Sequence, residues 1–85
     1  MEKKTGVYTL ANIGPNAFKG DVYVNGEFNT TTYPGELTIV KGVAVNDRIT
    51  IMKKTGFLEL GKEIFADFNI NIESIDFDYD EEQYY

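Results

Sequence analysis

The chain has 85 residues, of which 42% are hydrophobic and 14% aromatic, and its formal net charge is −6. A chain of this length buries only about 60–65% of its unfolded surface, which leaves material for one core and one domain. It contains no cysteine and no histidine. These absences remove disulfides, thiolate nucleophiles, the commonest zinc ligands and the commonest general base. We therefore expect a protein that is not an enzyme and that binds no metal or cofactor.

The N-terminal part of the chain has the alternating pattern of β-strands. Residues 6–13 alternate in this way and are followed by a break at Gly14-Pro15-Asn16. Two further runs, 21–24 and 27–31, flank Asn25-Gly26. An Asn-Gly pair accepts positive φ at both central positions of a two-residue hairpin turn. The sequence thus predicts one strand and then a β-hairpin.

The middle of the chain contains several short apolar runs separated by turn residues. Tyr33-Pro34-Gly35 predicts a turn, and residues 36–40 predict the strand after it. A short strand over 43–45 and a clearly alternating strand over 48–53 follow. We expect a further strand over 57–60.

The apolar pattern changes phase near the C-terminus. Residues 61–68 have room for a helical turn or two, but no longer helical period is present. Apolar residues occupy even positions over 66–72 and odd positions over 75–79. Because a change of phase in a period-2 pattern moves side chains to the other face, we expect a β-bulge or a corner at Glu73-Ser74.

These elements together predict an all-β fold. Short strands with turn signals every eight to twelve residues are typical of a small antiparallel β-sandwich or a partly open barrel, here of about seven strands. A single β domain covers 1–85 and ends in an acidic strand or tail over 73–85. Residues 1–72 carry eight acidic and eight basic side chains, whereas 73–85 carry six acidic and no basic ones. Such asymmetry is typical of a solvating tail or an interaction surface.

Residues 20–57 resemble the PEGA domain pattern. The similarity rests on Val22-Tyr23-Val24-Asn25-Gly26, the stretch Thr32-Tyr33-Pro34 and the ending Lys54-Thr55-Gly56-Phe57. The resemblance implies a small β-sandwich accessory module without catalysis, of a kind found mostly on cell-surface or multidomain proteins. The chain departs from the pattern at Val43-Ala44-Val45, which looks like an insertion before the last strand.

The acidic C-terminal segment is the candidate functional surface. On an extended strand, residues two apart lie about 6.8 Å apart on one face, so Asp76, Asp78 and Asp80 would form a carboxylate ladder. That spacing is close to the spacing of phosphates along a nucleic acid strand. We expect this segment to bind a basic protein surface or to mediate self-association. The predicted contact residues are Asp76, Asp78, Asp80, Glu81, Glu82, Tyr84 and Tyr85.

The same residues have three other interpretations. The segment is an acidic nucleic-acid mimic that inhibits a basic nucleic-acid-binding protein, or the solvated face of an edge strand, where charge discourages aggregation. It also repeats the start of a calcium-binding loop, although Glu81 stands where that loop requires glycine.

The remaining expectations concern partners and location. Eight basic residues scattered through a neutral body do not predict direct binding to nucleic acid. No run of residues is apolar enough to predict contact with a membrane. The basic start Met1-Glu2-Lys3-Lys4 is not followed by the apolar region of a signal peptide, so we expect a cytoplasmic protein.

Overall fold

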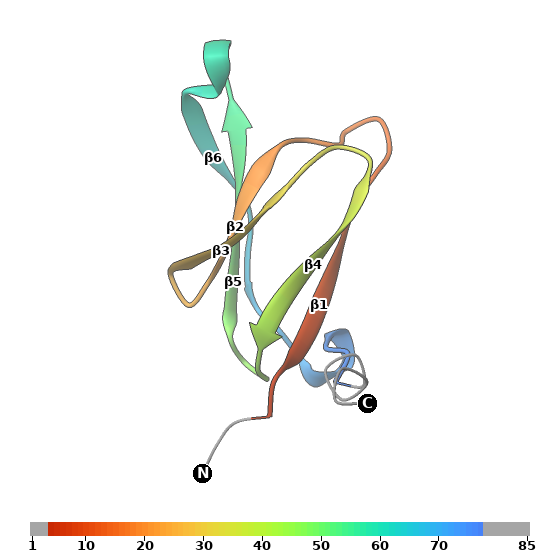
Figure 1. The fold of residues 1–85 in the computed structure, drawn as a ribbon. Coiled ribbons are helices and arrows are strands. Elements are labelled where there is room, and N and C mark those ends of the chain that lie inside the picture. The colour runs from red at the N-terminus through yellow and green to blue at the C-terminus, as the bar shows by residue number, and fades with distance from the viewer. Residues whose placement is uncertain (1–3, 78–85) are drawn as a thin grey trace.

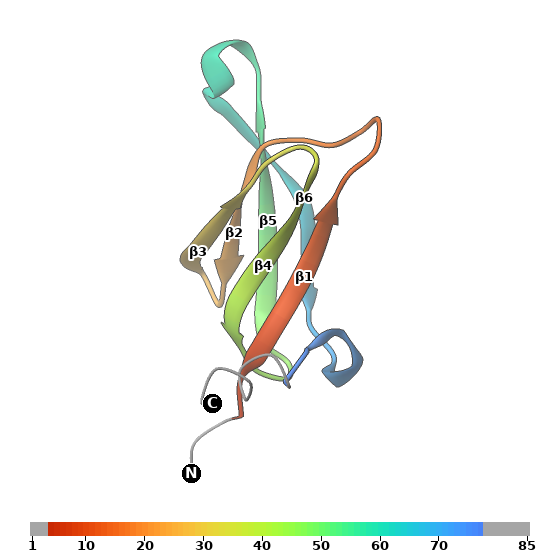
Figure 2. The same cartoon turned by 45° about the vertical axis from the view of Figure 1, so that its right-hand side comes forward.

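Alternating burial along short strands builds two antiparallel β-sheets that pack face to face (Figure 1, Figure 2). The computed structural model describes residues 4–77. The strands are β1 Gly6–Asn12, β2 Gly20–Val24, β3 Glu27–Thr32, β4 Glu36–Val43, β5 Arg48–Thr55 and β6 Gly61–Asn69, with short 3-10 helices η1 Phe57–Glu59 and η2 Ile72–Ser74. β1 pairs with β4, and the larger sheet has the order β3-β2-β5-β6. The predicted antiparallel sandwich is confirmed, with six strands in the described range in place of about seven.

The turn at Asn25-Gly26 fixes the centre of the larger sheet. The two residues have φ values of 53° and 83°, the pair of positive angles that a two-residue hairpin needs. The predicted hairpin is therefore confirmed as β2 and β3. On its other side β2 pairs with β5, where the Asn25 amide donates to the Arg48 carbonyl at 2.8 Å.

The core lies between the two sheets and follows from the alternation along the strands. Ile49 and Ile51 of β5 point toward the smaller sheet, while Thr50 between them lies on the outer face. The buried apolar side chains that form the core cluster are Leu10, Phe18, Val22, Val40, Val43, Ile49, Ile51, Ile70 and Ile75. Each contributes on the order of 1.5–3 kcal/mol when fully removed from water, and together they hold the sheets face to face.

A buried polar network also connects the two sheets. The Asn12 side-chain amide at the end of β1 donates to the Phe18 carbonyl at 2.5 Å and to the Thr32 hydroxyl at 3.0 Å. Its side-chain oxygen accepts from the Phe18 amide at 3.1 Å. The hydroxyls of Thr32 and Thr38 lie 2.6 Å apart, so β1, β3 and β4 share one hydrogen-bonded cluster. Because a shift of one sheet against the other would break these buried hydrogen bonds, the network favours a single alignment of the two sheets.

Two predictions in the segment after β5 are wrong. Residues 57–60 do not form a strand, because Leu58 and Glu59 have φ values of 59° and 57° and turn the chain back at η1. Residues 61–68 form no helical turns, because β6 pairs with β5 along its whole length from Thr55↔Gly61 to Arg48↔Asn69. The chain therefore makes one long hairpin, β5–η1–β6.

Two further boundaries differ from the prediction. Residues 43–45 do not form a strand of their own, since Val43 is the last residue of β4 and Val45 belongs to the turn before β5. The strand predicted over 66–72 is part of β6 and ends at Asn69. The phase change at Glu73-Ser74 coincides with η2, so the expected corner is present as a 3-10 turn.

The molecule is elongated, with extents of 45 × 23 × 19 Å. The end of the β5–β6 hairpin projects beyond the other strands at the top of Figure 1, whereas the β4–β5 turn and η2 lie at the opposite end. The β5–β6 hairpin projects because β2 pairs with β5 only as far as Lys53, whereas β6 pairs with β5 to its last residue, Thr55. No helix within residues 4–77 has the length and hydropathy needed to cross a bilayer.

Candidate functional site

The only predicted contact residue that lies in the described range is Asp76. It forms an isolated antiparallel bridge with Val7, in which the Asp76 amide donates to the Val7 carbonyl at 2.8 Å and the Val7 amide donates back at 3.1 Å. Asp76 is exposed, whereas the next residue, Phe77, is partly buried against the core. Asp76 and Phe77 therefore differ in exposure, as expected if Asp76 is the first residue of an extended carboxylate ladder. The other predicted residues, Asp78, Asp80, Glu81, Glu82, Tyr84 and Tyr85, lie outside the described residues, and the ladder stays a prediction.

Gly6 makes this bridge possible. A Cβ atom at Gly6 would lie 2.6 Å from the Asp76 carbonyl oxygen and 2.8 Å from Cγ2 of Ile75. Both distances are shorter than a carbon atom tolerates, so any side chain would push the C-terminal segment away from β1. The start of the acidic segment is thus held by a close backbone approach that only glycine permits.

A second candidate surface is the apolar end of the β5–β6 hairpin. Phe57, Leu58 and Leu60, here called the hairpin tip, are 85%, 72% and 81% exposed. Ile64 and Phe65 on β6 are 63% and 54% exposed and lie nearer the body of the protein, on opposite faces of the strand. We call the five residues together the hairpin patch.

The β6 strand contributes to the patch on both of its faces. Ile64 pairs with Met52 on the outer face of the larger sheet. A bulge opposite Ile51 and Met52 then turns Phe65 toward the core side, where its ring centre lies 4.4 Å from that of Phe18. The patch is therefore anchored to the core through an aromatic pair, and its orientation is fixed relative to the sandwich.

The exposed apolar area of the hairpin is large, but it is divided between two faces. With roughly 200 Å² for each large side chain, the exposed fractions of the hairpin tip correspond to about 500 Å². Ile64 and Phe65 add exposed area on opposite faces of β6. The hairpin tip alone thus reaches the size of the largest apolar patch on a typical monomer, roughly 300–600 Å², which is often functional.

Ion pairs surround the apolar hairpin. Lys53 lies 4.0 Å from Glu63 across the two strands, and Lys54 lies 3.8 Å from Asp21 of β2. The Glu59 carboxylate at the turn lies 3.4 Å from Lys19. An apolar centre with a rim of compensated charge is the anatomy of a protein interface.

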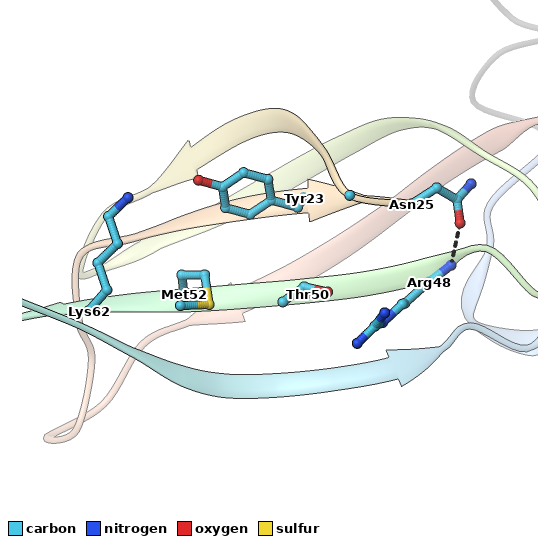
Figure 3. Close-up of a pocket in the computed structure, with 7 residues that line it drawn as sticks. Tyr23, Asn25, Arg48, Thr50, Met52 and Lys62 are labelled. Carbon is cyan, nitrogen blue, oxygen red and sulfur yellow. Dashed lines mark hydrogen bonds between the residues drawn. The ribbon is translucent and has the colours of Figure 1, made fainter.

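A third feature is a shallow depression of about 580 Å³ on the outer face of the larger sheet (Figure 3). It is lined by Tyr23, Asn25, Gly26, Arg48, Thr50, Met52 and Lys62. The Arg48 guanidinium donates two hydrogen bonds to the Asp67 carboxylate, at 2.8 and 2.6 Å, and holds the pKa of Asp67 below its usual value. This pairing neutralises the cation at one end of the depression, and no acid–base pair lines it.

A fourth feature lies at the other end of the molecule. Lys4, Ala44, Val45, Ile72 and Phe77 line a mostly apolar hollow of about 410 Å³, here called the end pocket. The Lys4 ammonium lies 5.0 Å from the centre of the Phe77 ring, within the range of a cation–π contact. Val45 and Ile72 are exposed at its opening.

Sequence reasoning found the start of the acidic segment but missed the hairpin patch. The signal was present in the apolar run Phe57-Leu58-Glu59-Leu60 between Gly56 and Gly61, which we predicted to be a strand. Among residues 4–77, no group of three or more acidic side chains is close enough to hold a metal ion. Of the three acids of the possible calcium loop, Asp78 and Asp80 lie outside the described residues, and the calcium interpretation stays a prediction.

Comparisons with known proteins give no match, since no protein-family model, no curated protein and no solved structure is significantly similar to the chain. The resemblance of residues 20–57 to PEGA domains therefore stays a prediction about sequence, and the functional argument rests on the geometry alone.

Proposed function

We propose that this protein is a non-catalytic interaction module that binds a protein surface through the hairpin patch. The observation that carries the proposal is the exposure of Phe57, Leu58 and Leu60 at the end of a projecting hairpin. Leaving three large apolar side chains in water forgoes on the order of 1.5–3 kcal/mol for each. A partner that covers them recovers this free energy.

A protein partner fits the surface better than a membrane does. Attraction to anionic lipid depends on uncompensated lysine and arginine near the surface, at about 1 kcal/mol for each. Here Lys53 and Lys54 have acidic partners within 4.0 Å, and the whole chain carries a net charge of −6. These charges favour a partner that provides apolar contacts with matched polar groups at the rim.

The acidic C-terminal segment is a second proposed contact surface of the same module. The backbone bridge between Val7 and Asp76 supports it, because the bridge holds the first residue of the ladder extended and exposed. The self-association and basic-partner interpretations both use this surface. The nucleic-acid-mimic interpretation depends on residues beyond Phe77 and stays a prediction.

The proposal is tested by site-specific photo-crosslinking in cells that express the protein. A photoreactive phenylalanine analogue is placed at Leu60, and a matched control places it at Ile13, an exposed apolar residue outside the strands. We expect crosslinks to protein from position 60 that disappear when Leu58→Ser is added, and none from position 13. Equal crosslinking from both positions, or none from position 60, would contradict the proposed function.

A further inference from the structure

We propose that the depression on the outer face of the larger sheet, here called the outer-face depression, binds a small aromatic carboxylate. The carboxylate lies at Lys62, and the aromatic ring lies over Tyr23 and Met52. These side chains come from β6, β2 and β5, which are neighbours in one sheet. The inference goes beyond the proposed function and does not depend on it, because none of the three residues belongs to the hairpin patch or to the acidic segment.

Alternation along the strands builds the floor of the outer-face depression. Ile51 of β5 is buried in the core, so its neighbours Thr50 and Met52 point to the outer face. Tyr23 of β2 lies opposite Thr50 and projects from the same face. Because β2 and β5 are central strands that pair on both sides, a ligand on this floor meets side chains and not an open backbone edge.

The Tyr23 ring is restrained beside this floor. Phe28 lies opposite Tyr23 on β3, with ring centres 6.0 Å apart and ring planes at 81°, a favourable edge-to-face pair. A ligand ring that enters the depression contacts Tyr23 and the Met52 thioether. Both contacts favour an aromatic group over an aliphatic one, so the floor selects a ring.

Lys62 distinguishes one end of the outer-face depression. It lies opposite Lys54 in the pairing of β5 with β6, and like charges in this arrangement destabilise a sheet. The Lys54 ammonium is compensated by the Asp21 carboxylate, 3.8 Å away. Within residues 4–77, no acidic side chain forms an ion pair with Lys62. An anion bound at Lys62 supplies the missing compensation.

The charge of the lining favours a carboxylate over a phosphate. Asp67 compensates Arg48, because its carboxylate lies 2.6 Å from the guanidinium. The depression therefore keeps a single uncompensated positive charge, that of Lys62. A carboxylate carries one negative charge, whereas a phosphate monoester carries about 1.5 to 2 near pH 7. One free cation is also too few for a nucleic-acid strand, whose affinity depends on several phosphate contacts.

The donors at the Lys62 end orient the ligand. Figure 3 shows the Tyr23 hydroxyl directed toward the Lys62 side of the depression. A phenolic hydroxyl and an ammonium both donate hydrogen bonds to a carboxylate, and the bond from the charged donor is the stronger one. At the opposite end an entering carboxylate meets the negative charge of Asp67 beside Arg48. The carboxylate therefore binds at Lys62, and the ring extends toward Thr50.

The size of the depression suits a small molecule that binds weakly. Its volume is about 580 Å³, within the roughly 300–1,000 Å³ of ligand sites in proteins. A benzene ring already fits a cavity of about 150 Å³, so a phenyl group with a short carboxylate chain has room. Because the depression is shallow, water reaches one side of the ligand, and we expect a dissociation constant on the order of 1 mM.

NMR titration of the isotope-labelled full chain tests the inference, with phenylacetate as the probe at concentrations up to about 20 mM. Two matched probes each lack one recognised group, since phenylacetamide has no charge and cyclohexylacetate has no aromatic ring. The charge variant is Lys62→Gln, and its control Lys41→Gln removes the same charge from an exposed side chain of β4 in the other sheet. The ring variant is Tyr23→Leu, and its control is Tyr33→Leu, at a half-exposed tyrosine outside the depression.

We expect phenylacetate to shift the amide signals of the lining residues with one saturable dependence on concentration. Phenylacetamide on the wild type and phenylacetate on Lys62→Gln should each bind about two- to fivefold more weakly, as expected when one exposed ion pair is lost. Loss of the aromatic contact, in cyclohexylacetate or in Tyr23→Leu, should weaken binding by about two- to tenfold. Both control variants should bind phenylacetate as the wild type does.

Three results would overturn the inference. The first is the absence of a saturable shift with phenylacetate over the whole concentration range. The second is an equal affinity of Lys62→Gln and Lys41→Gln for phenylacetate, which would show that Lys62 only solvates an edge strand. The third is equal binding of the three probes, which would show that the depression selects neither ring nor charge. If Tyr23→Leu does not fold, cyclohexylacetate alone decides the contribution of the ring, and the crosslinks from position 60 decide the proposed function separately.

Discussion

Replacing Asn12 by alanine should destabilise the protein far more than its small loss of volume suggests. The side chain is 4% exposed and provides three hydrogen bonds, two to the backbone of Phe18 and one to the Thr32 hydroxyl. Alanine has no group that replaces them. The Phe18 amide and carbonyl then stay buried without these partners, and the contact between β1 and β3 is lost.

The size of the effect follows from these orphaned groups. Each buried polar group left without a partner costs about 1–3 kcal/mol, so two backbone groups predict a loss of about 2–6 kcal/mol. A domain of 85 residues has a total free energy of unfolding of about 4–13 kcal/mol. The Asn12→Ala variant should therefore lose a large fraction of its stability.

Urea denaturation followed by circular dichroism measures this loss as a lower midpoint at an unchanged slope. Asn29→Ala is the matched control, because that side chain donates one exposed hydrogen bond, at 3.0 Å, to the Lys41 carbonyl. Its removal should cost less than about 1 kcal/mol. Equal losses for the two variants would show that the Asn12 network does not hold the sheets together.

Three further predictions concern the C-terminal bridge and two ionisable groups. Gly6→Ala should displace the residues after η2 and speed hydrogen exchange at the Asp76 amide, whereas protection equal to the wild type would refute the close approach. Arg48→Gln should raise the pKa of Asp67, measured by NMR titration, because the guanidinium hydrogen bonds are lost. Because the Asp67 pKa is lowered in the folded protein, the Arg48–Asp67 pair stabilises the fold above the usual aspartate pKa, and this stabilisation is lost as the pH falls. An Asp67 pKa that is the same in the Arg48→Gln variant and the wild type would argue against the contact. Burial raises the pKa of Tyr8, so its ionisation should destabilise the fold as the pH rises above 10. Tyr8→Phe should reduce that alkaline loss, and an identical alkaline profile would contradict this assignment.

The sequence predicted the fold class well because local signals determine most of the sandwich. Asn25-Gly26 selects a hairpin turn through its backbone angles, and the alternation around Ile49 and Ile51 assigns one face of β5 to the core. The corner at Glu73-Ser74 was predictable for the same reason, because a phase change is detected from the spacing of apolar residues that are close in sequence.

The hairpin patch was not predictable in this way. An apolar run such as Phe57-Leu58-Glu59-Leu60 has the same composition whether it is buried in a sheet or exposed at a turn. Its exposure depends on where β2 stops pairing with β5, which is a property of the register and not of the run itself. The end pocket likewise combines Lys4, Val45 and Ile72, which only the folded chain brings together.

The backbone of the turn at Leu58 and Glu59 places stability in conflict with the proposed binding through the hairpin tip. Two consecutive residues other than glycine hold left-handed angles there, at about 1–2 kcal/mol for each. Leu58→Gly would relieve part of this strain and should raise the melting temperature, but it deletes an apolar side chain of the tip. A substitution that makes this loop more heat-resistant would therefore weaken the proposed binding through the hairpin tip.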